Sequence, residues 1–222
     1  MRYQQLVTAL LCVVMLTPAV ASAQARVEVS GIAGWTLSDG VEGDGIRALD
    51  GNIYDAIDIK DSFSWGFGVG FNLTETAEVG FLFNQEMSTL RVEGTNTVDI
   101  GDMNVTSYHP YFAYNFGEAD ATLRPFILLG LGATSYASVP FSRPGFSGET
   151  GGDTQFSTTW GAGVKYFASP NVGVRLSATW TPTYITTEGG GWWCDPYWGC
   201  YVVGDAKYAN QFHFNGGITF RF

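Results

Sequence analysis

The chain has 222 residues, of which 45% are apolar, 15% are aromatic and only 14% are charged. Soluble domains carry about 25% charged residues on average, so this composition is atypical of a soluble domain, and it is too aromatic for a disordered segment. The formal net charge of −10 argues against a nucleic-acid-binding surface, which needs clustered lysine and arginine. No run of about 18 apolar residues is present, so the sequence predicts no membrane-spanning helix.

The first residues have the organisation of an export signal. Arg2 precedes an apolar stretch over residues 6–16, and Ala21-Ser22-Ala23 follows after Pro18. Signal peptidases cleave after such a small-x-small pattern, and the apolar stretch is too short to span a bilayer. We therefore predict a signal peptide over residues 1–23 and one exported domain over residues 24–222.

Export places the two remaining cysteines, Cys194 and Cys200, in an oxidising compartment where disulfides persist. We expect these cysteines to form a disulfide, and closing so small a ring contributes about 2 kcal/mol through the entropy of the unfolded chain. A zinc site would need two further ligands, and the histidines of the chain lie at distant positions. We therefore predict no metal site and no cofactor.

Apolar residues alternate with small or polar residues along most of the exported chain. Every odd position from Phe63 to Phe71 is apolar, and every even position between them is glycine or serine. The same alternation recurs over residues 172–180 and 211–222. A period of two predicts β-strands with one apolar and one polar face, and helical spacing does not produce it.

Eight segments of the chain show this alternation, and the connections between them alternate in length. Short links follow the second, fourth and sixth segments, and long links over residues 38–61, 89–101, 137–154 and 185–206 follow the others. Bacterial outer-membrane barrels have short turns at one end and long loops at the other. The sequence therefore predicts an all-β fold, an eight-stranded antiparallel up-and-down transmembrane β-barrel. Its predicted strands cover residues 26–37, 62–73, 77–88, 102–116, 122–136, 155–168, 171–184 and 207–222.

Aromatic residues are sorted toward the two ends of the predicted strands. Transmembrane barrels carry such girdles because an aromatic ring is stable at the headgroup level of a membrane. The girdle predicted toward the long connections consists of Trp35, Trp65, Tyr108, Trp160, Trp180 and Tyr208, and the one toward the short turns of Phe71, Phe81, Phe116, Tyr166 and Phe222.

The stretch Gly216-Gly217-Ile218-Thr219-Phe220-Arg221-Phe222 is similar to the insertion signal that the outer-membrane barrel assembly machinery recognises. The segments Trp160-Gly161-Ala162-Gly163-Val164-Lys165-Tyr166 and Val172-Gly173-Val174-Arg175-Leu176 resemble the small bacterial outer-membrane β-barrel family, which includes OmpA-like transmembrane domains. The resemblance implies a barrel in the bacterial outer membrane, surrounded by outer-membrane lipids and lipopolysaccharide. It also implies an assembly signal formed by Ile218, Phe220 and Phe222.

The second face of each predicted strand lines an interior that eight strands make just wide enough to be filled by side chains. Opposite charges there should pair, because an isolated ion in a poorly solvated tube is costly. We expect a polar plug, with a narrow ion or water path through the same groups as the alternative. The predicted lumen network consists of Glu28, Glu78, Glu86, His109, Arg124, Lys165, Arg175, His213 and Arg221, with Gln211 on the same face.

The two histidines of the chain, His109 and His213, are both predicted to face inward. A hydrolase that modifies lipid A would need one of them as a general base beside a nucleophile and an orienting carboxylate. The sequence has no Gly-x-Ser-x-Gly motif and no serine two residues after His213. We expect no enzymatic activity, and a serine within reach of either histidine at the lipid interface would favour the hydrolase.

Two long connections carry the remaining information. The connection over residues 38–61 is rich in acidic residues, which indicates a hydrated loop, and its spacing does not match an EF-hand. The aromatic residues around the two cysteines either cap the barrel mouth or form a platform for an extracellular glycan or protein. This possible platform consists of Trp192, Trp193, Tyr197, Trp198 and Tyr201.

The function predicted from the sequence is that of a non-enzymatic, monomeric outer-membrane barrel with a structural role or a surface-interaction role through its loops. The first alternative is a narrow porin-like channel, and the second is a lipid-A-modifying enzyme. A third alternative is a soluble periplasmic barrel, whose apolar side chains would line an internal lipid-binding cavity.

Overall fold

A computed structural model describes residues 27–39, 41–47, 53–94, 97–118, 120–143, 146–149, 152–184, 192–195, 199–202 and 208–222. The predicted signal peptide over residues 1–23 lies outside these residues. In the described part of the chain, no helix combines the length and the apolar character that a membrane crossing requires.

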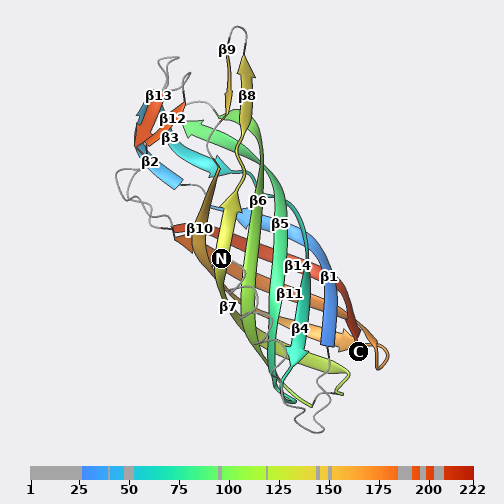
Figure 1. The fold of residues 1–222 in the computed structure, drawn as a ribbon. Helices are drawn as coiled ribbons and strands as arrows, with labels where there is room; N and C mark the ends of the chain where they lie inside the picture. Colours follow the sequence, from blue (N-terminus) through green and yellow to red (C-terminus); the bar gives the residue numbers. More distant parts are fainter. Residues whose placement is uncertain are drawn as a thin grey trace, which may run out of the picture.

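Eight long strands close into one antiparallel barrel (Figure 1). Each strand pairs with the next one of the barrel along the chain, and the last strand pairs with the first. The wall therefore has no open sheet edge, and this up-and-down topology is the predicted fold. The barrel strands are β1 (Val27–Ser38), β4 (Ser62–Asn72), β5 (Ala77–Gly94), β6 (Val98–Asn115), β7 (Leu123–Tyr136), β10 (Asp153–Phe167), β11 (Val172–Tyr184) and β14 (Tyr208–Arg221).

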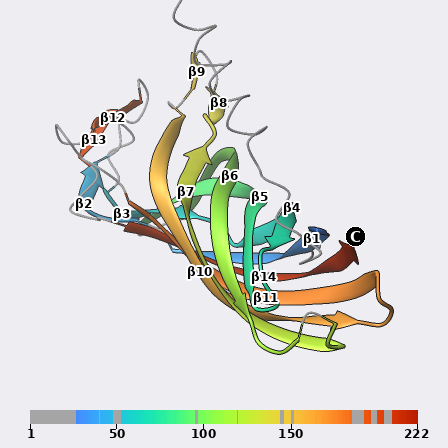
Figure 2. The ribbon, with the colours of Figure 1, turned by 60° about the horizontal axis from the view of Figure 1, so that its bottom comes forward.

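The two ends of the barrel differ in their connections (Figures 1 and 2). Short turns follow β4, β6 and β10 at the end where the C-terminus lies, here called the turn end. Connections at the opposite end, here called the loop end, contain further short strands. These strands are β2 (Val41–Arg47), β3 (Ile53–Ile59), β8 (Pro140–Arg143), β9 (Phe146–Glu149), β12 (Trp192–Asp195) and β13 (Gly199–Val202).

Side chains alternate between the lumen and the outer surface along each barrel strand. On β4, Phe63, Trp65, Phe67 and Phe71 are exposed on the outer surface, whereas the serines, glycines and Asn72 that alternate with them are buried. The other strands repeat this arrangement, with apolar side chains outward and mostly polar ones inward. A soluble lipid-binding barrel has the reverse arrangement, so the structure contradicts that alternative.

Glycines on the lumen face make room for the largest side chains of the interior. A methyl group on Gly80 would lie 2.6 Å from the Tyr111 ring, and one on Gly163 would lie 2.6 Å from the Phe126 ring. The methyl carbon would also lie 2.4 Å from the Val69 carbonyl oxygen or 2.3 Å from that of Leu176, so an alanine at either position would displace the neighbouring strand as well as the ring. The high glycine content therefore reflects a narrow interior that is filled by side chains.

Strands β5 and β6 are longer than the sequence predicts. Their predicted segments end at residue 88 and begin at residue 102, whereas β5 continues to Gly94 and β6 begins at Val98. The expectation of a long loop over residues 89–101 is therefore wrong.

The cause of this error is a reversal in the direction of the apolar side chains. In the extension of β5 and β6, the buried residues Leu90, Val92 and Met103 are apolar, and the outward residues Arg91 and Asp102 are charged. Residues in contact with lipid must be apolar, whereas residues in contact with water need not be. The reversal marks the level at which these two strands leave the membrane-facing part of the wall.

Aromatic side chains form a band on the outer surface toward the loop end. Trp160 lies directly opposite Trp180, and the Trp180 ring stacks on Phe212 with centroids 6.3 Å apart. On another part of the wall, Phe83 packs edge-on against Tyr108 with centroids 5.6 Å apart. This band corresponds to one of the two girdles predicted from the sequence.

Candidate functional site

A cluster of buried charges centred on Glu28 crosses the lumen near the turn end. The Glu28 carboxylate accepts hydrogen bonds from Lys165 Nζ at 2.6 Å, from Arg221 Nε at 3.1 Å and from Arg124 Nη1 at 3.4 Å. The amide of Asn72 donates to it at 3.3 Å. These four donors come from four different strands, so one carboxylate connects opposite walls of the barrel.

Glu78 is the second carboxylate of the cluster. It accepts hydrogen bonds from Lys165 Nζ at 2.5 Å, from the Tyr111 hydroxyl at 2.7 Å and from the Asn115 amide at 2.9 Å. Lys165 thus bridges Glu28 and Glu78, and all three side chains are buried. Loss of one member of such a group leaves an uncompensated charge in a poorly solvated interior.

Aromatic rings complete this cluster, here called the ionic plug. The Arg221 guanidinium lies 3.5 Å from the centroid of the Phe167 ring, and the Arg175 guanidinium lies 4.5 Å from that of Phe126. A desolvated cation–π contact contributes about 2 kcal/mol. Phe126 is an apolar residue on the mostly polar lumen face, and its ring faces the Arg175 guanidinium. The ionic plug consists of Glu28, Glu78, Arg124, Lys165, Arg175 and Arg221.

An apolar layer adjoins the ionic plug on the side of the loop end. Ile32 lies four residues beyond Glu28 along β1, and Leu82 lies four residues beyond Glu78 along β5. A hydrated ion does not cross a constriction of buried hydrocarbon without losing water. The layer consists of Ile32, Leu82, Tyr111, Ala113, Phe126 and Leu128.

Beyond the apolar layer, Glu86 has neutral partners only. Its carboxylate accepts hydrogen bonds from Gln211 Nε2 at 2.7 Å, from Ser62 Oγ at 3.0 Å and from Ser38 Oγ at 3.1 Å. Among the residues described, no basic side chain lies within 4 Å of Glu86. The expectation that charges of opposite sign pair throughout the lumen is therefore wrong at this level, where hydroxyl and amide donors take the place of a cation.

His213 lies at the same level of the lumen as these groups. Its Nδ1 lies 2.8 Å from Thr36 Oγ1 and 2.9 Å from Asn84 Nδ2. An amide nitrogen can only donate, so Nδ1 accepts a hydrogen bond and a neutral imidazole carries its proton on Nε2. His213 is therefore held in one orientation by a fixed set of lumen contacts.

His109 does have a serine within reach. Its Nε2 lies 2.9 Å from Ser157 Oγ, which also accepts a hydrogen bond from Thr134 Oγ1 at 2.9 Å. However, His109 is 1% exposed and Ser157 is 0% exposed, and both face the lumen rather than the lipid interface. No carboxylate among the described residues is hydrogen bonded to His109. Among the described residues, His109 and Ser157 thus provide the histidine and the serine of the hydrolase alternative, but both face the lumen and no carboxylate orients His109.

The structure places all nine residues of the predicted lumen network inside the barrel, but in two separate groups. Six of them form the ionic plug. Glu86 and His213 lie beyond the apolar layer, whereas His109 lies directly opposite Leu82 of that layer. Sequence reasoning missed Tyr111, Asn115 and Phe126 as partners of the plug. Tyr111 and Asn115 share the inward parity of His109 on β6, and that signal was sufficient to place them in the lumen.

At the loop end, β2 and β3 join the extensions of β5 and β6 in a four-stranded sheet, here called the loop-end sheet. Asp58 on β3 lies opposite Arg91 on β5, and its carboxylate accepts hydrogen bonds from Arg91 Nε at 2.7 Å and Nη2 at 2.5 Å. The hydrogen bond to Asp58 raises the pKa of Arg91 above its ordinary value, and burial partly opposes this increase. The sheet has a small apolar core formed by Leu90, Met103, Val105 and Val139, with Ile59, Ile100 and Tyr136 packed against it.

The aromatic connection after β11 contains the β12–β13 hairpin, which lies against β2 (Figure 1). In its antiparallel register, Cys194 lies directly opposite Cys200, and Trp193 lies opposite Tyr201. Directly opposed residues have Cα atoms about 4.5–5.5 Å apart, which is within the range that a disulfide spans. Trp192 is also in β12, whereas Tyr197 and Trp198 of the predicted platform lie outside the described residues.

We predict that Cys194 and Cys200 are bonded in the exported protein. Denatured, unreduced protein should then take up no thiol reagent, and both cysteines should be labelled after reduction. Export is required because the bond depends on an oxidising compartment. Labelling of both cysteines without reduction would show that the pair is free.

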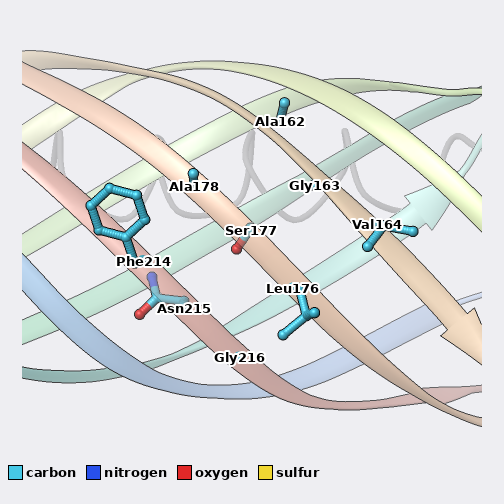
Figure 3. A pocket seen from close by; sticks show the side chains of 9 residues that line it. All are labelled: Ala162, Gly163, Val164, Leu176, Ser177, Ala178, Phe214, Asn215 and Gly216. Atoms are coloured by element: carbon cyan, nitrogen blue, oxygen red, sulfur yellow. The ribbon is translucent and has the colours of Figure 1, made fainter.

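The outer surface has a shallow open groove of about 500 Å³ over β10, β11 and β14 (Figure 3). Ala162 lies opposite Ala178, and these small side chains leave a depression between the bulkier Leu176 and Phe214. Its outward side chains are hydrocarbon, so it is suited to lipid acyl chains rather than to a polar substrate. The residues around it are Ala162, Gly163, Val164, Leu176, Ser177, Ala178, Phe214, Asn215 and Gly216.

The C-terminal residues of the predicted assembly signal end β14 at the turn end. Ile218, Phe220 and Phe222 are exposed on the outer surface, and the Phe222 backbone N–H donates to the Val27 carbonyl at 2.9 Å. Phe222 therefore directly follows β14, the strand that closes the barrel against β1.

We predict that deletion of Phe222 lowers the yield of assembled protein, because an exposed terminal aromatic would no longer be available to the assembly machinery. The measurement is the amount of heat-modifiable protein in the outer-membrane fraction. Phe222→Tyr keeps the aromatic ring and should retain normal yield. Equal yields of the deletion variant and the unaltered chain would contradict the assignment.

Comparison with known proteins agrees with this architecture. Outer membrane porin F of Pseudomonas fluorescens is 30% identical over 120 residues, which are 53% of this chain and 34% of that protein. The chain thus spans about a third of the length of that relative. The crystal structure of the outer membrane protein OprG from Pseudomonas aeruginosa has a TM-score of 0.62 at 11% identity, and the alignment covers 89% of this chain and 96% of OprG.

A second crystal structure, that of Neisserial surface protein A, has a TM-score of 0.52 at 13% identity. The alignment covers 90% of this chain and 100% of that protein. At these identities the two structures show a shared fold alone. The sequence itself matches the outer membrane protein beta-barrel domain over residues 6–222. This protein therefore belongs to the outer membrane protein beta-barrel domain family and is located in the bacterial outer membrane.

Proposed function

We propose that this protein is a non-enzymatic barrel that acts at the cell surface through its loop-end sheet and aromatic hairpin, with a lumen that does not conduct ions. In bacterial outer-membrane barrels the long loops are extracellular, so the loop end is the extracellular end. The proposal covers a partner outside the cell, either a glycan or a protein, and the lipopolysaccharide that surrounds the barrel.

The observation that carries the proposal is the continuation of β5 and β6 out of the membrane into a sheet with its own apolar core. Simple loops would suffice to connect the strands of a barrel with a structural role only. Here Leu90 and Met103 are buried in the extension, and Arg91 is paired with Asp58 across the sheet. An ordered surface of this kind, beside a hairpin rich in aromatic residues, is suited to binding because little conformational entropy is lost on contact.

The interior supports the second part of the proposal. A conducting path would have to pass the paired charges of the ionic plug and then the apolar layer of Leu82, Phe126 and Leu128. Lys165 bridges Glu28 and Glu78, and Glu28 is also paired with Arg124 and Arg221, so each carboxylate of the plug already has a cationic partner. The narrow-channel alternative would require both barriers to open.

Planar bilayers test the lumen directly. The reconstituted protein should give no steady ohmic conductance steps in potassium chloride, whereas Lys165→Ala should give more frequent openings because two carboxylates lose their common partner. A well-defined open channel in the unaltered protein would establish the porin-like alternative instead.

A trimmed variant separates the surface role from a purely structural one. Residues 40–60 carry β2 and β3, and a short Gly-Ser turn in their place removes half of the loop-end sheet. The variant should keep its heat-modifiable mobility and lose binding to the immobilised glycan or protein that the unaltered protein binds. Loss of the folded barrel on trimming would show that the sheet serves stability rather than recognition.

A further inference from the structure

Two prolines interrupt the hydrogen bonding of the barrel wall. Pro110 lies inside β6 and Pro182 inside β11, and each of these strands has a neighbour on both sides. A proline has no backbone N–H, so it removes a hydrogen bond from the ladder and is normally confined to edge strands. The pairing of β6 with β7 is interrupted at Pro110, and that of β10 with β11 at Pro182, without a change of register. Each proline therefore leaves a carbonyl of the neighbouring strand without its ladder donor.

The two interruptions lie in one row across the wall. The register of β6 with β7 places Pro110 opposite Leu131, and that of β10 with β11 places Pro182 opposite Thr158. Leu131 is itself paired with Thr158 between β7 and β10. Strands β7 and β10 thus lack a hydrogen bond on both flanks at the same row, here called the proline row.

Between the proline row and the loop end, β7 and β10 are attached firmly on one flank and weakly on the other. In this part of the wall β7 keeps four pairs with β6. Among the residues described, β10 keeps one pair with β11, that of Ser157 with Thr183, whereas β11 stays paired with β14 as far as Tyr184. Separation of β10 from β11 therefore breaks few hydrogen bonds.

The outward side chains of this part of β7 and β10 are suited to water rather than to lipid. Thr154 on β10 is exposed, and its hydroxyl donates a hydrogen bond to Ser135 Oγ on β7 at 3.0 Å. Residues in contact with lipid are apolar, so this part of the wall has left the membrane. Its movement does not need to displace acyl chains.

Side chains in the lumen join the strands beside the interrupted pairs. Thr181 Oγ1 donates to Thr159 Oγ1 at 3.2 Å, one residue from each member of the interrupted pair of β11 and β10. His109 is adjacent to Pro110, and its Nε2 lies 2.9 Å from Ser157 Oγ on β10. These contacts partly replace the missing backbone hydrogen bonds, but each depends on the rotamers of two side chains.

We infer that the loop-end parts of β7 and β10, residues 132–136 and 153–157, form a hinged flap in the barrel wall. The flap bends at the proline row and opens by separation of β10 from β11, and the contacts of His109 and Thr159 hold it closed. Opening admits water from the side to the part of the lumen that contains Ser157 and Thr159. The ionic plug lies nearer the turn end and stays closed, and the flap is independent of what the loop-end sheet binds.

Amide hydrogen exchange of the full chain in micelles, measured residue by residue by NMR, tests the flap. The amides of Thr158 and Tyr184, on either side of the remaining pair, should exchange about tenfold faster than that of Met103 in the loop-end sheet. Pro182→Val restores the N–H that faces the Thr158 carbonyl. It should slow exchange at positions 158 and 184 about fivefold, the effect of one added hydrogen bond.

Pro125→Val is the matched control, because Pro125 is the third residue of β7, at the turn end and away from the proline row. It should leave exchange at Thr158 unchanged. Thr181→Val removes a hydroxyl that holds the flap closed and should accelerate exchange there about fivefold. This variant decides the question if Pro182→Val does not give heat-modifiable, folded protein. Unchanged rates in both Pro182→Val and Thr181→Val, or equal rates at Thr158 and Met103 in the unaltered protein, would overturn the inference.

Discussion

Lys165→Met should destabilise the barrel by about 3–5 kcal/mol, the cost of removing one partner from a buried ionic group. Lys165 is hydrogen bonded to both Glu28 and Glu78, so the methionine leaves two buried carboxylates without their common cation. The methionine has a similar volume, which separates the effect of charge from that of packing. Urea-dependent unfolding of the micelle-bound protein, followed by tryptophan fluorescence, measures the change in the free energy of unfolding.

Two further variants control this experiment. Lys60→Met removes an exposed lysine of the loop end and should change the free energy of unfolding by less than about 0.5 kcal/mol. Adding Glu78→Gln to Lys165→Met should restore part of the lost stability, since Glu78 is the carboxylate left without a cation, whereas Glu28 keeps Arg124 and Arg221. A Lys165→Met variant as stable as the unaltered protein would show that the plug is hydrated and not a desolvated network.

Leu176→Arg should destabilise the assembled barrel by about 2–4 kcal/mol, because a charge near the middle of the lipid-facing wall must leave water. Leu176 is 56% exposed on the outer surface of β11, so an arginine there meets no steric obstacle within the protein. In a water-soluble protein the same substitution at so exposed a position would have little effect. Reversible unfolding in lipid vesicles measures the difference.

Asn104→Arg is the matched control for this substitution. Asn104 is an exposed outward residue of β6, but it lies in the extension where Met103 and Val105 face inward. It should therefore tolerate arginine with a change of less than about 0.5 kcal/mol. Equal costs at positions 104 and 176 would contradict the assignment of a boundary between lipid and water along the wall.

The alternation of apolar and polar residues was sufficient to predict the barrel. Eight segments with an apolar face, joined by long links at one end, are compatible with few other folds. The same criterion failed where the surroundings of the strand change. Leu90, Val92 and Met103 continue the alternation beyond the membrane with the apolar face turned inward, and a search for apolar outward faces stops there. A switch of the apolar residues from the outward to the inward face within one strand thus indicates the membrane boundary.

Which residues face the lumen could be predicted from the sequence, but which of them contact each other could not. Parity alone places Glu86 and Lys165 inside, but which groups meet depends on the stagger of the strands around the barrel. That stagger brings Lys165 to Glu28 and Glu78 and leaves Glu86 among hydroxyl and amide donors. Phe126 interrupts the polar pattern of β7 because its ring covers Arg175, a reason that exists only in the folded barrel.

The contact between the outer face and lipid is tested most directly by nitroxide side chains placed along β6 and β11. Collision rates with oxygen, which partitions into lipid, and with a water-soluble nickel chelate distinguish the surroundings of each position. At Phe112 and Leu176, labels should collide mainly with oxygen, and at Asn104 a label should collide mainly with nickel, although all three residues face outward. Labels at positions 112 and 176 that are shielded from oxygen would show that the apolar face is covered by protein and would contradict the barrel described above.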